Sequence, residues 1–513
     1  MFLGLDCGTS GLKALIVDDS GAAVASASRA YLPDRPRPGW SEQDPDVWRT
    51  AMAGAIADLR ASSAKAVGAV KAVGFSGQMH GTVLIDRADR PVRPALLHND
   101  GRAHEEAAEL AQNFPHLAGV VGVKPMPGFT GPKLLWLARN EPELRGRIDC
   151  VLAPKDYLRL ALTGERGSDM SDAAGQWLLD EAARVWSPDA IAACGAYPAW
   201  APRLHEGADA VGTVRTASAE EFGLPSGAVV AAGGGDAAVG AVGLGAIGPG
   251  EAFISLGTAT QLIVATERYL SAPEKLVHSF AHALPARWYA MAAMLNGAGA
   301  LAFAARLLGS SPDTLEREAT EGYRGPGALI FLPYLSGERT PLDDPYARGV
   351  LFGMSETTSR ADVARAVMEG VALTLAEARD CLAAAGASIE RVGLIGGGAK
   401  SALWTKMIAA ATGFTVVRMK GGETGPAYGA ARLARMAATG EPPEAVCQRP
   451  EIADVTDPDP ALTEAFVRQR ERFKALYGAL KGEFWRPFAP KVAEGRMRGG
   501  RAPSGKISAA PHP

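Results

Sequence analysis

The sequence predicts an α/β protein of two domains, each built around a mixed β-sheet. Three observations lead to this prediction: the chain has 513 residues, a glycine-rich hairpin pattern occurs twice, and a strand, a triple glycine and a helix follow one another in each half. A chain of this length exceeds what one ordinary hydrophobic core supports. Strands that alternate with helices are typical of sheets covered by helices.

The repeated hairpin joins two apolar runs through a Gly-Thr turn. One copy covers residues 2–17 with Thr9 at its turn, and the other covers residues 252–264 with Thr258 at its turn. Apolar runs joined by a short glycine turn are typical of a β-hairpin. Glycine lets backbone N–H groups surround an anion, and hydroxyl groups add donors. The two copies therefore predict a duplicated domain whose halves face each other across one polyphosphate.

The second repeated pattern places a triple glycine between a strand and a helix. In the first half, strand 228–232 leads into three glycines and Asp236, and a helix is expected over residues 237–244. In the second half, strand 391–395 is followed by three glycines and by a helix expected over residues 401–411. We expect a mixed sheet in each half from this alternation.

The glycine-rich link at residues 245–250 predicts the domain boundary, since it also contains Pro249. The expected domains are residues 1–245 and residues 246–485. Residues 486–513 are rich in Pro, Gly, Ala and Arg and carry six basic residues against one acidic residue. This segment is predicted to be a disordered tail, because it is too poor in apolar residues to fold; a tail that contacts anions is the alternative.

Local signals place a few further elements. Residues 67–74 and 82–85 are expected to form strands on either side of a turn. Ser359 and Asp362 form a capping-box pattern at the start of a long helix, for which Gly386 is the expected C-terminal cap.

Composition argues against several classes of protein. The net charge of −3 gives no long-range field that would attract nucleic acid or an anionic membrane. The five cysteines show no CxxC spacing, which argues against a zinc site or a disulfide framework and suits a reducing cytosol. No apolar run approaches the length of about 18 residues that a transmembrane helix needs. We therefore expect a cytoplasmic protein that binds neither nucleic acid nor membrane.

Two carboxylates are candidates for chemistry. Asp236 follows a strand and three glycines, where the backbone can approach a ligand and the carboxylate can project into a cleft. An N-cap role at the start of the following helix is equally compatible with that position. Asp6 lies beside the first predicted phosphate turn, which favours a Mg²⁺ site, although an aspartate can also cap its own turn.

Several separate motifs, in one order, resemble the FGGY carbohydrate kinases over residues 1–480. These motifs are residues 5–13, 78–81, 99–102, 154–157, 168–175, 233–236 and 332–341, together with the longer patterns 128–140 and 349–369. The resemblance implies two ribonuclease H-like domains of the actin, hexokinase and Hsp70 ATPase type with a cleft between them. It also implies ATP and Mg²⁺ as cofactors and a sugar as substrate. The residues of these motifs are most similar to those of the family members that phosphorylate D-xylulose on its 5-hydroxyl.

The resemblance also implies a role for individual residues. Asp236 is the expected general base and Asp6 the expected Mg²⁺ ligand. The expected phosphate contacts are Thr9, Ser10, Lys13, Gly257 and Thr258, and the expected adenosine contacts are Gly397, Gly398 and Ala399. The expected sugar contacts are Gln78, Met79, His80, Asn99, Asp100 and Asp236. Taken as residues alone, Lys13 can be merely solvated, Gln78 can support its turn, His80 can be structural and Asp100 can pair with Arg102.

Three positions differ from the usual motif of members that phosphorylate D-xylulose. His98 stands where a tryptophan usually precedes Asn99, Ala237 where an asparagine usually follows the base, and Ala259 where a serine usually follows the second Gly-Thr pair. His98 removes an apolar wall beside the sugar, and Ala259 removes a hydroxyl donor. None of the three replaces the base or the metal carboxylate, so kinase activity stays the expectation.

Three alternatives stay open on the sequence. The first is a kinase for another ketose or polyol, which His98 suggests. The second is a sugar-sensing protein without catalytic activity, and the third is an Hsp70-like chaperone ATPase. A homodimer is an open possibility for the oligomeric state.

Overall fold

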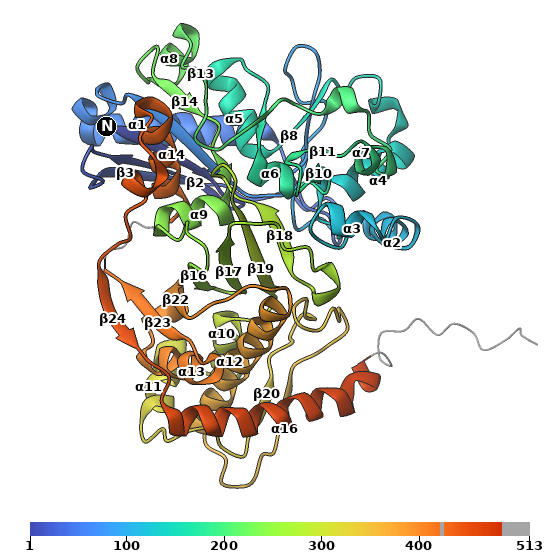
Figure 1. Ribbon diagram of the computed structural model, residues 1–513, viewed down its shortest axis with the longest axis vertical. Coiled ribbons are helices and arrows are strands. Elements are labelled where there is room, and N and C mark those ends of the chain that lie inside the picture. Colours follow the sequence, from blue (N-terminus) through green and yellow to red (C-terminus); the bar gives the residue numbers. More distant parts are fainter. Residues whose placement is uncertain (421–424, 485–513) are drawn as a thin grey trace, which may run out of the picture.

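The computed structural model describes residues 1–420 and 425–484, so the predicted tail lies outside the described residues. Two seven-stranded sheets lie one above the other in Figure 1, with helices between them and on their outer faces. Both sheets mix parallel and antiparallel strands, which confirms the predicted fold class.

The strands of the two large sheets have the following bounds. The N-terminal sheet contains β1 (Phe2–Cys7), β2 (Gly11–Val17), β3 (Ala23–Ala30), β5 (Ala72–Gly77), β13 (Ala210–Thr213), β14 (Val229–Ala231) and β15 (Gly234–Gly235). The C-terminal sheet contains β16 (Ala252–Leu256), β17 (Thr260–Thr266), β18 (His278–Ala281), β19 (Trp288–Met294), β22 (Arg391–Ile395), β23 (Thr415–Met419) and β24 (Ile452–Thr456).

The remaining strands form two-stranded pairs. These are β4 (Glu42–Gln43) with β7 (Ala95–Leu96), β6 (Val83–Ile85) with β8 (Cys150–Leu152), β9 (Ser168–Asp169) with β12 (Leu204–His205), β10 (Leu179–Asp180) with β11 (Val185–Trp186), and β20 (Ile330–Leu332) with β21 (Val350–Phe352).

The helices of the N-terminal half are α1 (Pro45–Gly68), α2 (His104–Asn113), α3 (Leu117–Val120), α4 (Thr130–Asn140), α5 (Pro154–Thr163), α6 (Met170–Ala174), α7 (Pro188–Ala193), α8 (Thr216–Phe222) and α9 (Asp236–Leu244). Those of the C-terminal half are α10 (Ala298–Leu307), α11 (Pro312–Thr320), α12 (Arg360–Ala384), α13 (Ala402–Thr412), α14 (Pro426–Thr439), α15 (Pro443–Val446) and α16 (Pro460–Phe484).

The two large sheets repeat one pattern of strand directions. In the N-terminal sheet β2 pairs antiparallel with both β1 and β3. The strands β1, β5 and β14 run parallel to one another, and β13 pairs antiparallel with β14 at the edge of the sheet. The C-terminal sheet shows the same directions. There β17 takes the place of β2, β19 that of β3, β16 that of β1, β22 that of β5, β23 that of β14 and β24 that of β13. This agreement confirms the duplication that the repeated hairpin predicted.

Both predicted hairpins are present. In the first, the Gly8 N–H donates to the Gly11 carbonyl at 3.0 Å, and in the second the Gly257 N–H donates to the Ala259 carbonyl at 3.1 Å. The capping box at Ser359 and Asp362 is also confirmed, and Gly386, with a φ of 92°, follows the cap residue Ala385.

The strand expected at residues 67–74 begins later than predicted. Helix α1 continues to Gly68, and β5 starts only at Ala72. Ala66 and Val67 are buried in the last turn of the helix, so the apolar run belongs partly to the helix end and partly to the strand.

Helix α14 comes from the C-terminal half but packs on the N-terminal sheet, against β1 and β5 and beside α9. Glycines make this close approach possible. A Cβ atom at Gly4 would lie 1.9 Å from the Ala427 carbonyl oxygen, and one at Gly74 would lie 1.9 Å from that of Ala430. A Cβ atom at Gly429 would lie 2.0 Å from the Val239 carbonyl oxygen in α9. The backbone of α14 therefore rests directly on the sheet.

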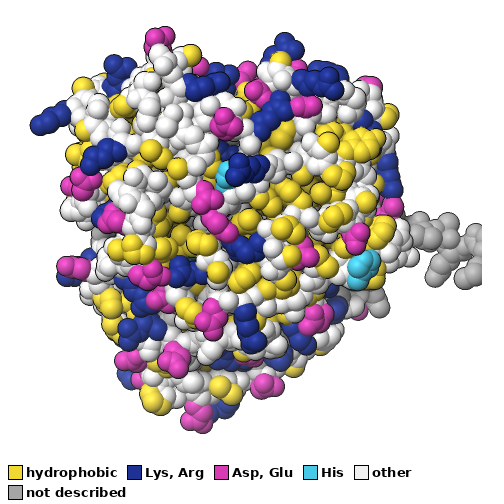
Figure 2. Space-filling model, turned by 45° about the horizontal axis from the view of Figure 1, so that its top comes forward, with side chains coloured by type: hydrophobic (Ala, Val, Ile, Leu, Met, Phe, Trp, Pro, Cys, Tyr) yellow, Lys and Arg dark blue, Asp and Glu magenta, His cyan; other side chains and the backbone are white. Residues whose placement is uncertain are grey.

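The outer surface mixes charges of both signs. Figure 2 shows acidic and basic side chains interspersed around hydrophobic ones on one face of the molecule. Within the described part of the chain, no helix combines the length and the apolar character needed to cross a membrane.

A Gly74→Ala substitution tests the close packing of α14. The new methyl group has no room beside the Ala430 carbonyl, so we expect α14 to be pushed outward and the protein to lose at least about 2 kcal/mol of stability. The matched control is Gly68→Ala, because nothing lies within 4 Å of a Cβ atom there. Thermal unfolding of both variants should show a lower Tm for Gly74→Ala alone; equal values would contradict this packing.

Candidate active site

The candidate site residues of the N-terminal domain gather at one edge of its sheet. Asp6 of β1 is in register with Ser76 of β5, and Ser76 is in register with Gly234 of β15. Asp236 follows β15 directly, so the sheet brings both predicted carboxylates to the same edge. The charge of Asp6 accordingly contributes to raising the pKa of Asp236.

Asp236 does not cap its helix. Gly235 is the N-cap residue of α9 and Asp236 is the first helical residue, with no side-chain capping bond. The N-cap interpretation is therefore wrong, and the carboxylate is available to a ligand. Burial, together with the nearby charge of Asp6, raises the pKa of Asp236 to about 7, while the Ala237 N–H opposes this rise. A carboxylate with a pKa near neutrality is suited to accept and return a proton.

Asp6 has the properties of a cation ligand. Its Oδ1 atom is buried and has no hydrogen-bond partner among the described residues. Burial raises the pKa of Asp6, and the Ser76 hydroxyl and the Lys13 charge oppose that rise. Within residues 1–420 and 425–484, no group of three or more His, Cys, Asp or Glu side chains is arranged so that it could hold a metal ion by itself. A single carboxylate suits Mg²⁺, which is commonly held by one or two carboxylates together with substrate phosphates and water.

The turn that carries Asp236 is held at both of its ends. Arg159 Nη1 donates to the Ala232 carbonyl at 2.9 Å, and the Gly235 N–H donates to Ser171 Oγ at 3.0 Å. Ser171 Oγ in turn donates to Asp169 Oδ2 at 2.5 Å. These side chains are fully buried, so the position of Asp236 depends on a dry polar network behind it.

The first phosphate turn is tied to the predicted sugar turn. Thr9 Oγ1 donates to Gln78 Oε1 at 3.1 Å, and Gln78 Nε2 donates to the Gly8 carbonyl at 3.4 Å. Gln78 is buried, and its amide is engaged in these contacts, which agrees with a supporting role. Ser10 is exposed at the tip of the turn. Lys13 faces Asp6 across the hairpin, where its charge opposes the rise that burial causes in the pKa of that carboxyl.

The second phosphate turn lies beside the glycines expected to contact adenosine. Thr258 is exposed at the tip of the hairpin, and the Gly257 carbonyl accepts a bond from the Ala298 N–H at 2.7 Å. β16 pairs in parallel with β22, which places Leu256 next to the triple glycine. A Cβ atom at Gly398 would lie 2.5 Å from the Leu256 side chain. The structure thus brings Gly257 and Thr258 to the same sheet edge as Gly397, Gly398 and Ala399.

The predicted sugar turn contains Met79 and His80 in an aromatic surrounding. His80 Nδ1 donates to the Gly175 carbonyl at 2.6 Å, and the ring packs edge-on against Phe129 at 4.5 Å. Tyr289 donates its hydroxyl to Met79 Sδ at 3.6 Å. Burial lowers the pKa of His80 well below its usual value, so the imidazole is neutral at pH 7.

The second predicted sugar loop, residues 98–100, contains both exposed and buried residues; the predicted sugar turn that contains Met79 and His80 is the first. His98 and Asn99 are exposed, whereas Asp100 is buried against Arg102 with a closest N–O distance of 2.7 Å. Asp100 also accepts bonds from the Ser41 and Arg102 N–H groups. The open alternative, in which Asp100 pairs with Arg102, is thus the arrangement observed. Although part of the His98 side chain is exposed, desolvation of its ring by the surrounding protein, together with the charges of Lys133 and Arg339, lowers its pKa to about 4, so this imidazole is neutral as well.

Sequence reasoning missed two aromatic residues of the C-terminal domain that form a wall beside the predicted sugar turn. His278 and Phe280 lie two residues apart on β18, so both point to one face, and their rings lie within 6.5 Å of Phe129 or His80. The alternation of these residues along a strand was the available signal. Sequence reasoning also missed the fully buried Lys133, whose surroundings come from segments distant along the chain.

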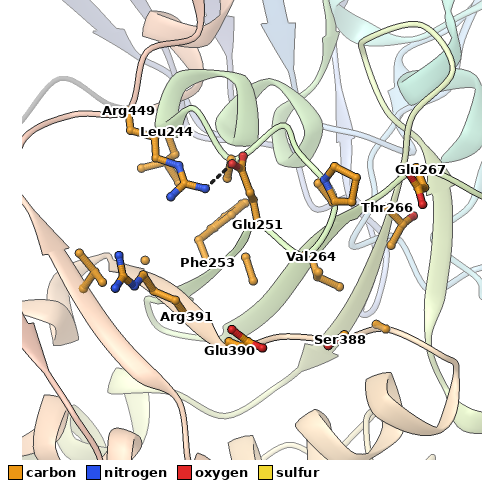
Figure 3. Close-up of a pocket in the computed structure, with 18 of the residues that line it drawn as sticks. Leu244, Glu251, Phe253, Val264, Thr266, Glu267, Ser388, Glu390, Arg391 and Arg449 are labelled. Carbon is orange, nitrogen blue, oxygen red and sulfur yellow. Dashed lines mark hydrogen bonds and ion pairs between the residues drawn. The ribbon is translucent and has the colours of Figure 1, made fainter. Parts of the chain in front are cut away.

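One sizeable cavity lies away from these residues. A cavity of about 700 Å³ opens beside the link between the domains, with Phe253, Val264 and Arg391 on its walls (Figure 3). At its rim Glu251 pairs with Arg449 and accepts bonds from two N–H groups of the link. None of the predicted site residues lines this cavity.

Comparison with known proteins gives one consistent result. Residues 1–243 match the FGGY family of carbohydrate kinases, N-terminal domain, and residues 252–438 match the C-terminal domain of the same family. The chain is 44% identical to the xylulose kinase of Escherichia coli (strain K12) over 94% of this chain and 99% of that protein, and 42% identical to the xylulose kinase of Klebsiella pneumoniae over the same shares. A crystal structure of a xyloylose kinase from Brucella ovis has 44% identity, a TM-score of 0.91, and coverage of 94% of this chain and 99% of that chain. The expected fold of the actin and hexokinase type is confirmed.

The raised pKa of Asp236 predicts a pH-dependent gain in stability for Asp236→Asn. The pKa is about 7 in the folded protein against 3.8 for an ordinary aspartate, so ionisation opposes folding. This cost is absent below pH 3.8, grows by at most about 1.4 kcal/mol per pH unit up to pH 7, and is constant above. Thermal unfolding with EDTA should therefore show a Tm advantage for Asp236→Asn that grows from pH 5 to pH 7 and then levels off. A difference independent of pH would contradict the raised pKa.

Proposed function

The chain belongs to the FGGY family of carbohydrate kinases, and we propose that it transfers the γ-phosphoryl group of ATP to the 5-hydroxyl of D-xylulose. The observation that carries this proposal is Asp236, a carboxylate without a capping bond and with a pKa of about 7, at the sheet edge shared with Asp6. The xylulose kinases that match almost the whole chain support D-xylulose as the substrate. Family membership also removes the chaperone alternative.

In the proposed reaction Asp236 accepts the proton of the sugar 5-hydroxyl. The hydroxyl oxygen then forms a bond to the γ-phosphorus while the bond from that phosphorus to the bridging oxygen breaks, and ADP leaves with the bridging oxygen. For this reaction the protein must hold the carboxylate of Asp236 in a fixed position and in the correct protonation state. The hydrogen bonds to Ala232 and Gly235 support the first requirement, and the raised pKa of Asp236 supports the second.

We further propose that ATP lies across the two Gly-Thr turns. Thr9, Ser10 and Lys13 would contact phosphates from the N-terminal domain, and Gly257 and Thr258 from the C-terminal domain. Gly397, Gly398 and Ala399 would support adenosine. Asp6 would hold Mg²⁺, which when bound neutralises charge on the phosphates. The orphaned Oδ1 atom of Asp6 supports this assignment.

The proposed sugar contacts differ in kind. Met79, His80, Asn99 and Asp236 would touch the sugar. Gln78 and Asp100 were predicted as contacts too, but their polar atoms are engaged with the Gly8 turn and with Arg102, so we assign both to supporting the loops.

We also propose a cytoplasmic location, where ATP is available and thiols stay reduced. All five cysteines are free, which agrees with a reducing compartment. A homodimer, and the lack of nucleic-acid and membrane partners, stay predictions.

A substrate panel tests the proposed function. We expect the highest kcat/KM for D-xylulose among D-xylulose, L-ribulose, L-xylulose, glycerol and gluconate, measured by ADP release. A better value for another ketose would favour the alternative that the exposed His98 suggests, and sugar-independent or absent turnover would favour a sensor. Asp236→Ala should lower kcat by about 10²–10⁴ because it removes the base; near-normal turnover would overturn that role.

A Ser171→Ala substitution tests whether the buried network positions the base. The variant leaves the Gly235 N–H without its acceptor, so we expect a fall in kcat of at least about tenfold with little change in either KM. Ser187→Ala is the matched control, since Ser187 is also buried and caps α7 away from this turn. Equal losses of kcat in the two variants would mean that Ser171 acts only through general stability.

A further inference from the structure

We propose that Lys133 is a positioning residue that joins the two sugar loops through one buried amine. Lys133 lies in α4 with no exposed surface. Its Nζ atom donates to the His80 carbonyl at 2.8 Å and to the Leu96 carbonyl at 3.2 Å. His80 belongs to the first sugar loop, and Leu96 directly precedes the second. The inference rests on the proposed sugar-binding role of these loops.

His80 needs such support because its backbone is strained. Its φ of 68° lies in the left-handed region, which a residue with a side chain rarely adopts. Residues in such conformations persist where the surrounding structure fixes them. Lys133 fixes the His80 carbonyl, Thr130 Oγ1 reaches the same oxygen at 3.4 Å, and the Gly175 carbonyl fixes the ring. The two contacts to the carbonyl both come from the first turns of α4.

Helix α4 reaches the second loop at another point as well. The Trp136 side chain, three residues after Lys133, lies with its ring 5.0 Å from the Arg102 guanidinium. Arg102 forms the buried pair with Asp100 and stacks on Trp40 at 3.6 Å. One face of α4 thus contacts both β7, which leads into the second sugar loop, and the Asp100–Arg102 pair at the end of that loop.

The chemistry of the Lys133 site suits hydrogen bonding rather than charge pairing. No carboxylate of the described residues lies at ion-pair distance from its Nζ atom, and burial lowers the pKa of Lys133 to about 7. Whether protonated or neutral, the amine has enough N–H groups to donate to both carbonyl acceptors. Asp100 and Arg102 are the nearby charges, and their effects on Lys133 are opposite in sign.

The substitution Lys133→Met keeps the length of the side chain and removes both donors. We expect the KM for D-xylulose to rise by about tenfold, with the KM for ATP within about twofold, because only the sugar loops lose a contact. Leu137→Ala is the matched control: this buried residue of the same helix packs in the hydrophobic core and does not contact either loop carbonyl. It should lower Tm at least as much while leaving the KM for the sugar unchanged.

A second measurement does not depend on activity. Hydrogen exchange of the ligand-free protein should become faster in both residues 78–81 and residues 97–102 for Lys133→Met, and in neither segment for Leu137→Ala. Faster exchange in one segment only, or in both variants alike, would overturn the bridging role. Failure of the wild-type protein to phosphorylate D-xylulose would instead overturn the proposed function, and the exchange result would still decide the role of Lys133.

Discussion

The candidate site depends on one buried ion cluster behind the turn that carries Asp236. Lys155 Nζ lies 2.5 Å from Asp156 and 2.9 Å from Asp169, with Asp172 at 3.3 Å, and Arg159 completes the cluster. Burying charges is costly unless they are paired and hydrogen-bonded. Burial raises the pKa of Asp172 well above its usual value, and the charge of Lys155 opposes that rise. Arg159 and Ser171, which both belong to this buried network, hold the backbone on the two sides of the triple glycine.

The two Gly-Thr hairpins share a backbone but not a chemistry. Asp6 is the last but one residue of β1 in the first hairpin, and Ser255 is the last but one residue of β16 in the second. Only the first hairpin therefore brings a carboxylate to the shared sheet edge, beside the turn that carries Asp236. Ala259 leaves the second hairpin with Thr258 as its hydroxyl donor. The proposed phosphate clamp is therefore asymmetric, because corresponding positions at the ends of equivalent strands carry different side chains while the strands themselves stay the same.

Local patterns were sufficient to predict the hairpins, the glycine turns and the capping box, because each depends on residues close together in the sequence. The start of β5 was misplaced, since an apolar run does not reveal where a helix ends and a strand begins. The residues alone also left Asp236 between a cap and a base, and the family resemblance favoured the base. The packing of α14, the pairing of Asp100 with Arg102 and the contacts of Lys133 join distant segments. No periodicity in a single sequence carries that information.

The proposed sugar site takes residues from both domains, and hydrogen bonds between the domains hold the C-terminal residues in place. The Ala281 N–H in β18 donates to Glu181 Oε2 at 2.7 Å, and the Ser279 N–H donates to the Gly122 carbonyl at 2.9 Å. These bonds carry the strand with His278 and Phe280 to the N-terminal domain. One continuous hydrophobic cluster, which includes Phe280 and residues of α9 and α14, lies behind this wall. Residues of the C-terminal domain therefore stand beside His80, and the shape of the proposed sugar site depends on the domain interface as much as on the two loops.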